Sequence, residues 1–122
     1  MTASALARTA LGRYGEDVAA RHLVAAGMAI LERNWRCDLG EIDIVARSGD
    51  VLVFVEVKTR ATTAFGSPAE AVTARKAARL RRLSARWLAE HRVCAAEVRI
   101  DVIGVVIPHR GGPEIDHLEA VA

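Results

Sequence analysis

The sequence is poor in cysteine, and the two that it has, Cys37 and Cys94, do not form a Cys-x-x-Cys pair. So few thiols at this spacing predict neither a disulfide framework nor a zinc site, which makes the reducing cytoplasm the default location. Free cysteine usually behaves as a small apolar side chain. Both residues are therefore interpreted as small members of the core.

Long hydrophobic runs are also absent. The longest, "VLVFV" at 51–55 and "VIGVVI" at 102–107, are far shorter than the roughly 20 residues that span a bilayer. The segment "MTASALARTA" at 1–10 contains no apolar block of the kind found in secretory signals. No membrane partner is expected. Because 52% of the 122 residues are apolar, we expect one folded domain over residues 1–122.

The sequence has little excess of positive over negative charge, since its net charge is only +2. Positive charge is nevertheless concentrated in one segment. Seven basic residues lie between positions 75 and 92, against the single acid Glu90: Arg75, Lys76, Arg79, Arg81, Arg82, Arg86 and Arg92. A solvated helix face would explain this excess. The lack of balancing acids favours phosphate contact, so the candidate nucleic-acid-binding residues are Arg75, Lys76, Arg79, Arg82 and Arg86.

Hydrophobic periodicity predicts an α/β domain. A helix is expected over 5–26, closed by Gly27, followed by strands at 28–36, 40–47 and 51–59. Ser67 as N-cap, Pro68 and Glu70 predict the start of a second helix that runs to about His91. Strands at 96–107 and 114–120 complete the chain. The order αβββαβ with one further strand predicts a mixed sheet flanked by helices.

The stretch "GEIDIVARSGDVLVFVEVKTR" at 40–60 predicts a hairpin with its turn at Gly49-Asp50. In that register one face is wholly aliphatic, with Ile42, Ile44 and Ala46 opposite Val57, Val55 and Val53. The other face pairs Val45 with Phe54, Asp43 with Glu56, and Glu41 with Lys58. Because side chains alternate along a strand, Asp43, Glu56 and Lys58 are expected on one face.

Like charges on facing strand positions repel, and a carboxylate beside apolar side chains loses hydration. A divalent cation would remove both penalties. Mg²⁺ binds through one or two carboxylates and further oxygens, which Asp43, Glu56 and the carbonyl of Val57 could supply. Lys58 would then stand beside the attacking water, help to lower its pKa and offset charge on a phosphate. It is one of only two lysines beside 15 arginines, which hints that an amine is required.

A further acid on the first helix has a different setting from its neighbour. Asp17 has Arg13 and Arg21 four residues to either side, an exposed ion-pair row. Glu16 lies instead in a stripe of small and apolar residues, so we predict that it reaches the Asp43/Glu56 site as an accessory acid. A partly exposed helix residue is an equally good interpretation of Glu16. The hairpin charges could likewise be a surface salt-bridge cluster of Glu41, Glu56, Lys58 and Arg60.

Several of these motifs together resemble a known family. They are "G-x-x-G-E" at 12–16, "GEIDIVA" at 40–46, "LVFVEVKTR" at 52–60, and "FGSPAEAV" followed by Lys76. They resemble the PD-(D/E)XK nuclease superfamily, in particular its Holliday-junction-resolvase branch, and more closely the bacterial YraN family. The likeness covers about residues 11–107. The proline of the superfamily motif is Ile42 here, at a position that varies within the superfamily.

The resemblance implies a restriction endonuclease-like fold and a Mg²⁺- or Mn²⁺-dependent phosphodiesterase. By resemblance, Asp43 and Glu56 bind the metal, Lys58 assists catalysis and Glu16 is a further active-site acid. It also makes a homodimer a candidate assembly, because resolvases act as homodimers. We therefore predict an endonuclease acting on DNA. The alternatives are a non-catalytic nucleic-acid-binding module of the same fold and a structural or protein-interaction domain.

Overall fold

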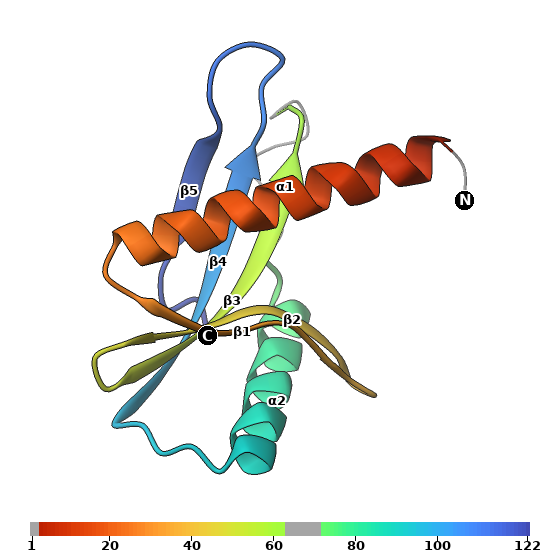
Figure 1. Cartoon of the computed structure of the whole chain (residues 1–122). Coiled ribbons are helices and arrows are strands. Elements are labelled where there is room, and N and C mark those ends of the chain that lie inside the picture. The colour runs from red at the N-terminus through yellow and green to blue at the C-terminus, as the bar shows by residue number, and fades with distance from the viewer. Residues whose placement is uncertain (1–2, 63–71) are drawn as a thin grey trace.

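The computed structural model describes residues 3–62 and 72–122, and all structural statements concern these residues (Figure 1). The elements are α1 (Ala3–Ala25), β1 (Ala29–Cys37), β2 (Gly40–Ser48), β3 (Val51–Arg60), α2 (Ala74–His91), β4 (Glu97–Val106) and β5 (Glu114–Leu118). The strands form one sheet in the order β1-β2-β3-β4-β5. Only the β3–β4 pairing is parallel, with α2 in the connection between the two strands. The predicted mixed α/β sheet with an αβββαβ core is confirmed.

The two helices cover opposite faces of the sheet, and each face has its own apolar core (Figure 1). On one face, Val18, Ala19 and Leu23 of α1 pack with residues such as Ile44 and Val55. On the other, α2 contributes Leu80, Leu83 and Trp87, which pack with residues such as Val45 and Phe54. A sheet covered on both faces explains why the central strands are almost continuously apolar.

The predicted hairpin register is confirmed over the half nearest the turn. Ser48 faces Val51, Ala46 faces Val53, and the ladder runs on to Ile44 facing Val55. It ends there, before the expected opposition of Asp43 and Glu56. Beyond it, the Val57 N–H donates to the Asp43 carboxylate, with 2.7 Å between nitrogen and Oδ2. The strands therefore separate at the position where the predicted site begins.

One face assignment was wrong at this point of divergence. Ile42 was expected beside Ile44, but it packs in the α2-side core with Val45 and Phe54, whereas Ile44 packs on the α1 side. Strict alternation from Ile42 to Ile44 is thus broken at Asp43. The neighbouring strand β1 is also irregular, with a register shift between Ile30 and Glu32. That shift lies opposite Ala46 and Val45, and Asp43 lines a cleft together with residues of α1.

Both helices have the end signals that their geometry requires. Gly27, after α1, has a φ of +93°, a conformation that an L side chain rarely adopts. α2 begins at Ala74, where the extended Thr73 is the N-cap and its side chain accepts from the Lys76 N–H, so the helix starts later than predicted. The expected start at Ser67, Pro68 and Glu70 lies outside the described residues.

Both cysteines are free, as predicted, but only one contacts the core. Cys37 packs against the α2-side core, whereas Cys94 is exposed, so its interpretation as a core residue was wrong. Among the described residues, neither helix is long and apolar enough to cross a membrane.

Candidate active site

A cleft of about 880 Å³ opens between α1 and the diverging strands β1, β2 and β3. Its charged lining residues are Arg8, Arg13, Glu16, Asp17, Arg33, Arg36, Asp43 and Lys58. Asp43, Lys58 and Glu16 were all predicted as site residues from sequence, and the cleft brings these three together. Val57, proposed as a carbonyl ligand, also lines it, while Glu56 lies beside it.

A close approach between backbone and side chain places Glu16 at this cleft. Gly15 of α1 lies directly against the Thr59 side chain on β3, with no room for a Cβ. Glycine at this position therefore lets the helix settle on the end of β3. The next residue, Glu16, is only 8% exposed and points into the cleft. The "G-x-x-G-E" motif thus has a packing reason for its second glycine.

Both oxygens of Glu16 are occupied by groups from β1. Arg33 Nε donates to Oε1 at 2.9 Å, and Asn34 Nδ2 donates to Oε2 at 2.8 Å. Asn34 holds a positive φ of 56° and also donates to Glu41. The interpretation of Glu16 as a partly exposed helix residue is therefore wrong, because it is a buried acceptor that fixes β1 against α1.

Asp43 has the most perturbed acid–base behaviour in the cleft. Burial raises the pKa of Asp43 to about 6, the hydrogen bond from the Val57 N–H opposes that rise, and the charges of Glu41, Glu16 and Glu56 add to it. Three other carboxylates are thus close enough to disfavour its ionised form. Perturbed carboxyl groups of this kind are concentrated at functional sites.

Glu56 is buried between the strands and α2 and is under-satisfied. Lys58 Nζ and Arg79 reach the same oxygen, Oε1, at 3.6 and 3.7 Å. Within residues 3–62 and 72–122, Oε2 is buried and has no hydrogen-bond partner. A buried carboxylate oxygen without a donor is costly, so this atom is suited to a cation.

The basic residues predicted on α2 occupy three different environments. Arg79 reaches Glu56, and the charge of Lys58 lowers the pKa of Lys76, so Lys76 and Arg79 lie beside the site. Arg86 instead donates to Asp38 at 2.8 Å. Arg75 and Arg82 are exposed. The row is therefore not one uniform surface.

The expected salt-bridge cluster on the hairpin is only partly present. Glu41 pairs with Arg36 of β1 rather than with Lys58. Among the described residues, Arg60 makes no ion pair within 4.0 Å, and its buried Nε has no hydrogen-bond partner. Only the contact between Lys58 and Glu56 remains of the predicted cluster.

These carboxylates fit a hard divalent cation by their chemistry. Mg²⁺ requires oxygen ligands and commonly uses one or two carboxylates with water. Asp43 has a carboxylate whose charge is disfavoured, and Glu56 has a buried oxygen without a donor. The two acids and Glu16 do not meet as a group whose ligand atoms all lie within 4.8 Å. We therefore identify Asp43 and Glu56 as the metal-binding candidates and Glu16 as a neighbour.

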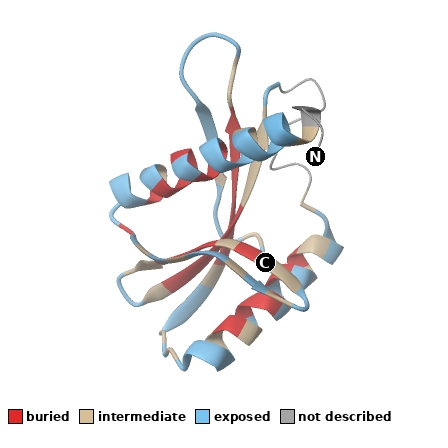
Figure 2. Cartoon of the chain, turned by 45° about the vertical axis from the view of Figure 1, so that its right-hand side comes forward, coloured by how far each residue is buried: buried red, intermediate tan, exposed pale blue. Residues whose placement is uncertain are grey.

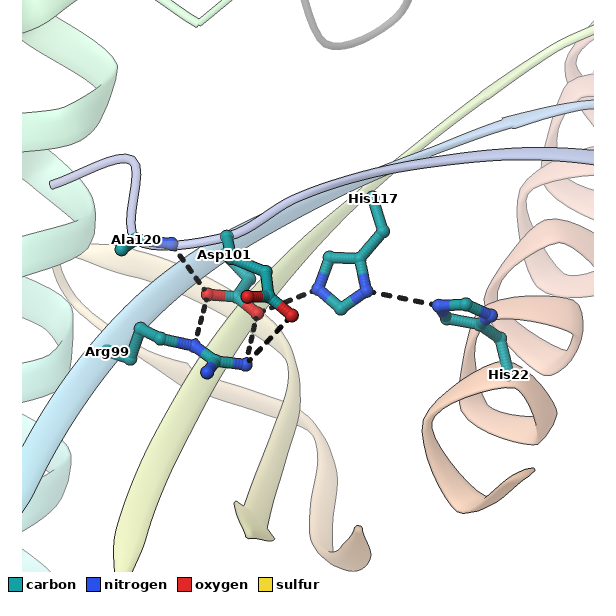
Figure 3. Close-up of polar contacts among 6 residues, drawn as sticks. His22, Arg99, Asp101, His117 and Ala120 are labelled. Atoms are coloured by element: carbon teal, nitrogen blue, oxygen red, sulfur yellow. Dashed lines mark hydrogen bonds and ion pairs between the residues drawn. The ribbon is translucent and has the colours of Figure 1, made fainter. Parts of the chain in front are cut away.

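A second polar cluster, centred on Asp101 of β4, was missed from sequence (Figure 3). Asp101 is fully buried, and Arg99 donates to both of its oxygens at 3.0 Å. His117 of β5 contacts Oδ2 at 2.7 Å, and the Ala120 N–H donates to Oδ1. His22 of α1 then contacts His117 at 3.0 Å. A charged residue inside the apolar run of β4 was the available signal.

Among the described residues, Asp101, His117 and Glu119 form a group of three potential metal ligands whose ligand atoms all lie within 4.8 Å of one another. The arrangement nevertheless differs from that of Glu56, because both Asp101 oxygens are already occupied by donors. The guanidinium of Arg99 lies where a cation would compete for the carboxylate. We interpret the cluster as a buried ion-pair network that ties β4, β5 and α1 together.

Comparison with known proteins finds matches over nearly the whole chain. The model of the uncharacterised protein family UPF0102 matches residues 15–105. A UPF0102 protein of Nocardioides sp. is 55% identical over 99% of both chains. A UPF0102 protein of Beutenbergia cavernae is 59% identical over 94% of this chain and 98% of its own. One from Frankia alni is 61% identical over 92% of this chain and 93% of its own.

Proposed function

The chain belongs to the uncharacterised protein family UPF0102, the family of YraN, and from that premise we propose that it is a metal-dependent endonuclease. The proposed reaction is hydrolysis of a nucleic-acid phosphodiester bond with Mg²⁺ or Mn²⁺, and the proposed substrate is DNA, including branched DNA. The YraN resemblance is confirmed by the family match. Membership of the nuclease superfamily remains a prediction.

The observation that supports this proposal most is the state of two carboxyl groups, those of Asp43 and Glu56. Burial and neighbouring acids raise the pKa of Asp43 to about 6. Glu56 has a buried oxygen, Oε2, without a hydrogen-bond donor among the described residues. A structural salt-bridge cluster would satisfy both groups. A cation-binding site, by contrast, leaves part of their negative charge and the Oε2 atom of Glu56 without a partner until the ion arrives.

Bound Mg²⁺ or Mn²⁺ would supply Lewis-acid chemistry at a phosphoryl oxygen and lower the pKa of water. Lys58 lines the cleft 3.6 Å from Glu56, and its proposed role is to orient the attacking water and to offset charge on the phosphate. Glu16 holds Arg33 and Asn34 at the cleft and raises the pKa of Asp43 through its charge. It is proposed as a positioning residue rather than a metal ligand.

Lys76 and Arg79 approach Glu56 from the side of α2. We propose that they contact the phosphate next to the one that is cut. Arg75 and Arg82 are exposed on the same helix and would extend this contact. Arg86 contributes less, because its guanidinium is already held by Asp38.

The test is a cleavage panel of linear, flapped and four-way DNA and matching RNA, with Mg²⁺, Mn²⁺ or EDTA. The variants are Glu56→Gln, Asp43→Asn and Lys58→Met, and the control is Glu90→Gln, an exposed acid on α2. We expect metal-dependent cleavage by wild type and by the control, with a loss on the order of 100-fold or more in the three variants.

The same panel separates the alternatives. Binding without cleavage by the wild type, unchanged in Lys58→Met, would favour a nucleic-acid-binding module of this fold. Neither binding nor cleavage on any substrate would leave a structural or protein-interaction domain. Cleavage that persists in Glu56→Gln would contradict the assigned site.

A further inference from the structure

The first half of α1 carries a basic surface that the proposed chemistry does not use. Residues 6–10 and 12–14 are all exposed, whereas the buried residues of α1 lie in its second half (Figure 2). In Figure 1 this first half extends past the strands toward the N-terminus. Arg8 and Arg13 lie on it, and both line the cleft that contains Asp43 and Lys58.

The ion pairs of the cleft leave these two arginines uncompensated. Arg33 forms ion pairs with Glu16 and Asp17, at 2.9 and 2.7 Å. Arg36 forms an ion pair with Glu41 at 3.1 Å. Within residues 3–62 and 72–122, no carboxylate lies within 4.0 Å of Arg8 or Arg13, and no other hydrogen-bond partner is present.

The sequence predicted otherwise for Arg13. Asp17, four residues later, was expected to pair with Arg13 and Arg21 along the helix, but Arg33 of β1 occupies its Oδ1 instead. Folding of β1 against α1 therefore removes the acid that would neutralise Arg13. The result is an exposed positive charge directed at a cleft that holds buried carboxylates.

Helical spacing sets these two charges along one path into the site. Arg8, Gly12 and Glu16 follow one another at intervals of four residues, as do Thr9 and Arg13, and all five line the cleft. At about 1.5 Å per residue, Arg13 lies roughly 4.5 Å along the axis from Glu16 and Arg8 roughly 12 Å from it. Two positions so far apart along the axis can contact two different phosphates.

We propose that Arg8 and Arg13, the α1 arginine pair, hold the phosphate backbone of the nucleic acid where it enters the cleft. This rests on the proposed function for its substrate class, but it assigns the entry path to α1, which sequence reasoning did not use. A polyanionic backbone is the occupant that fits, because the pair is continuous with the site proposed to cut it. Arginine also has the fork geometry that matches phosphate oxygens.

The experiment measures binding without cleavage, by fluorescence anisotropy of labelled single-stranded and duplex DNA in EDTA from 50 to 200 mM salt. The test variant is Arg8→Gln/Arg13→Gln. The matched control is Arg21→Gln/Arg81→Gln, which removes two exposed arginines outside the cleft. Thermal melting of each protein confirms that it is folded. Polyglutamate is the competitor that tests for general anion binding.

We expect the test variant to bind more weakly on every sequence. The magnitude of its slope of log affinity against log salt should fall by about 1.8 on duplex DNA or about 1.4 on single strands. These values correspond to the loss of two phosphate contacts. The control should keep the wild-type slope. An unchanged slope in the test variant, an equal loss in the control, equal competition by polyglutamate, or no salt-dependent binding by wild type would each overturn the proposal.

The experiment distinguishes failure of the proposed entry path from failure of the proposed nuclease activity. If the wild type cleaves but the α1 pair does not affect binding, only the entry path fails. If the wild type binds through the α1 pair but does not cleave with any metal, the nuclease fails and the binding path stands.

Discussion

Gly15 of α1 lies directly against the side chain of Thr59 on β3, with no space for a Cβ between them. This contact fixes the distance between helix and strand one residue before Glu16 and one residue after Lys58. The geometry of the cleft therefore depends on a residue that has no chemistry of its own.

Gly15→Ala should destabilise the protein by about 1–3 kcal/mol, because the added methyl group forces the helix away from β3. The control is Gly12→Ala on the same helix, where the added methyl group meets nothing within 4 Å and should stabilise by about 0.5–1 kcal/mol. Urea unfolding of both variants measures the difference. Thr59→Ala in the Gly15→Ala background should recover part of the loss. Equal stabilities of the two alanine variants would contradict the close approach.

Asp43 should make the metal-free protein less stable as the pH rises from about 4 to 6. The folded protein binds its proton more tightly than the unfolded chain, since burial raises the pKa to about 6 from an ordinary value of 3.8. The unfolded chain therefore releases the proton first, and the free energy of unfolding falls across that window. Asp43→Asn removes this loss, which is on the order of 3 kcal/mol. Melting temperatures from pH 4 to 8 would show a flatter profile in the variant. A wild-type profile that rises through the same window in parallel with the variant would contradict the assignment.

Asp101→Asn should destabilise the protein by about 3–5 kcal/mol, because it removes the nearer and fully buried of the two carboxylates that pair with Arg99. The control is Glu119→Gln, which removes a more distant, exposed partner of Arg99 at 3.7 Å and should cost less than about 1 kcal/mol. Denaturant titrations at one pH compare the two. If a divalent cation stabilised the wild type through Asp101, the same titrations with added Zn²⁺ would reveal it and contradict our interpretation of a closed ion-pair network.

The parts of the fold that could be predicted depend on local patterns. Alternation of apolar residues fixed the hairpin register from Ile44 to Ser48, because a slip by one residue would bury the polar face. The position of Gly27 marked the end of α1 through its positive φ. Asp43 and Lys58 were correctly predicted as neighbours in one site, but the alternation that suggested it is broken at Asp43.

The rest required contacts between segments far apart in sequence. Ile42 changes face just beyond the point where the β2–β3 ladder ends, which no pattern within β2 reveals. Asp17 pairs with Arg33 of β1 rather than with Arg13 of α1, because the Arg33 guanidinium reaches the Asp17 carboxylate once β1 packs against α1. The Asp101 network joins residues from three elements, so only its isolated charge in an apolar strand was visible beforehand.

The most direct test of the proposed site is calorimetric titration of Mn²⁺ into the metal-free protein at neutral pH. Wild type and Glu90→Gln should bind the ion with equal affinity, while Asp43→Asn and Glu56→Gln should each lose at least tenfold. The affinity should also fall below about pH 6, as Asp43 takes up its proton. A wild type that binds no Mn²⁺, or carboxylate variants that bind it as tightly as the wild type, would contradict the account.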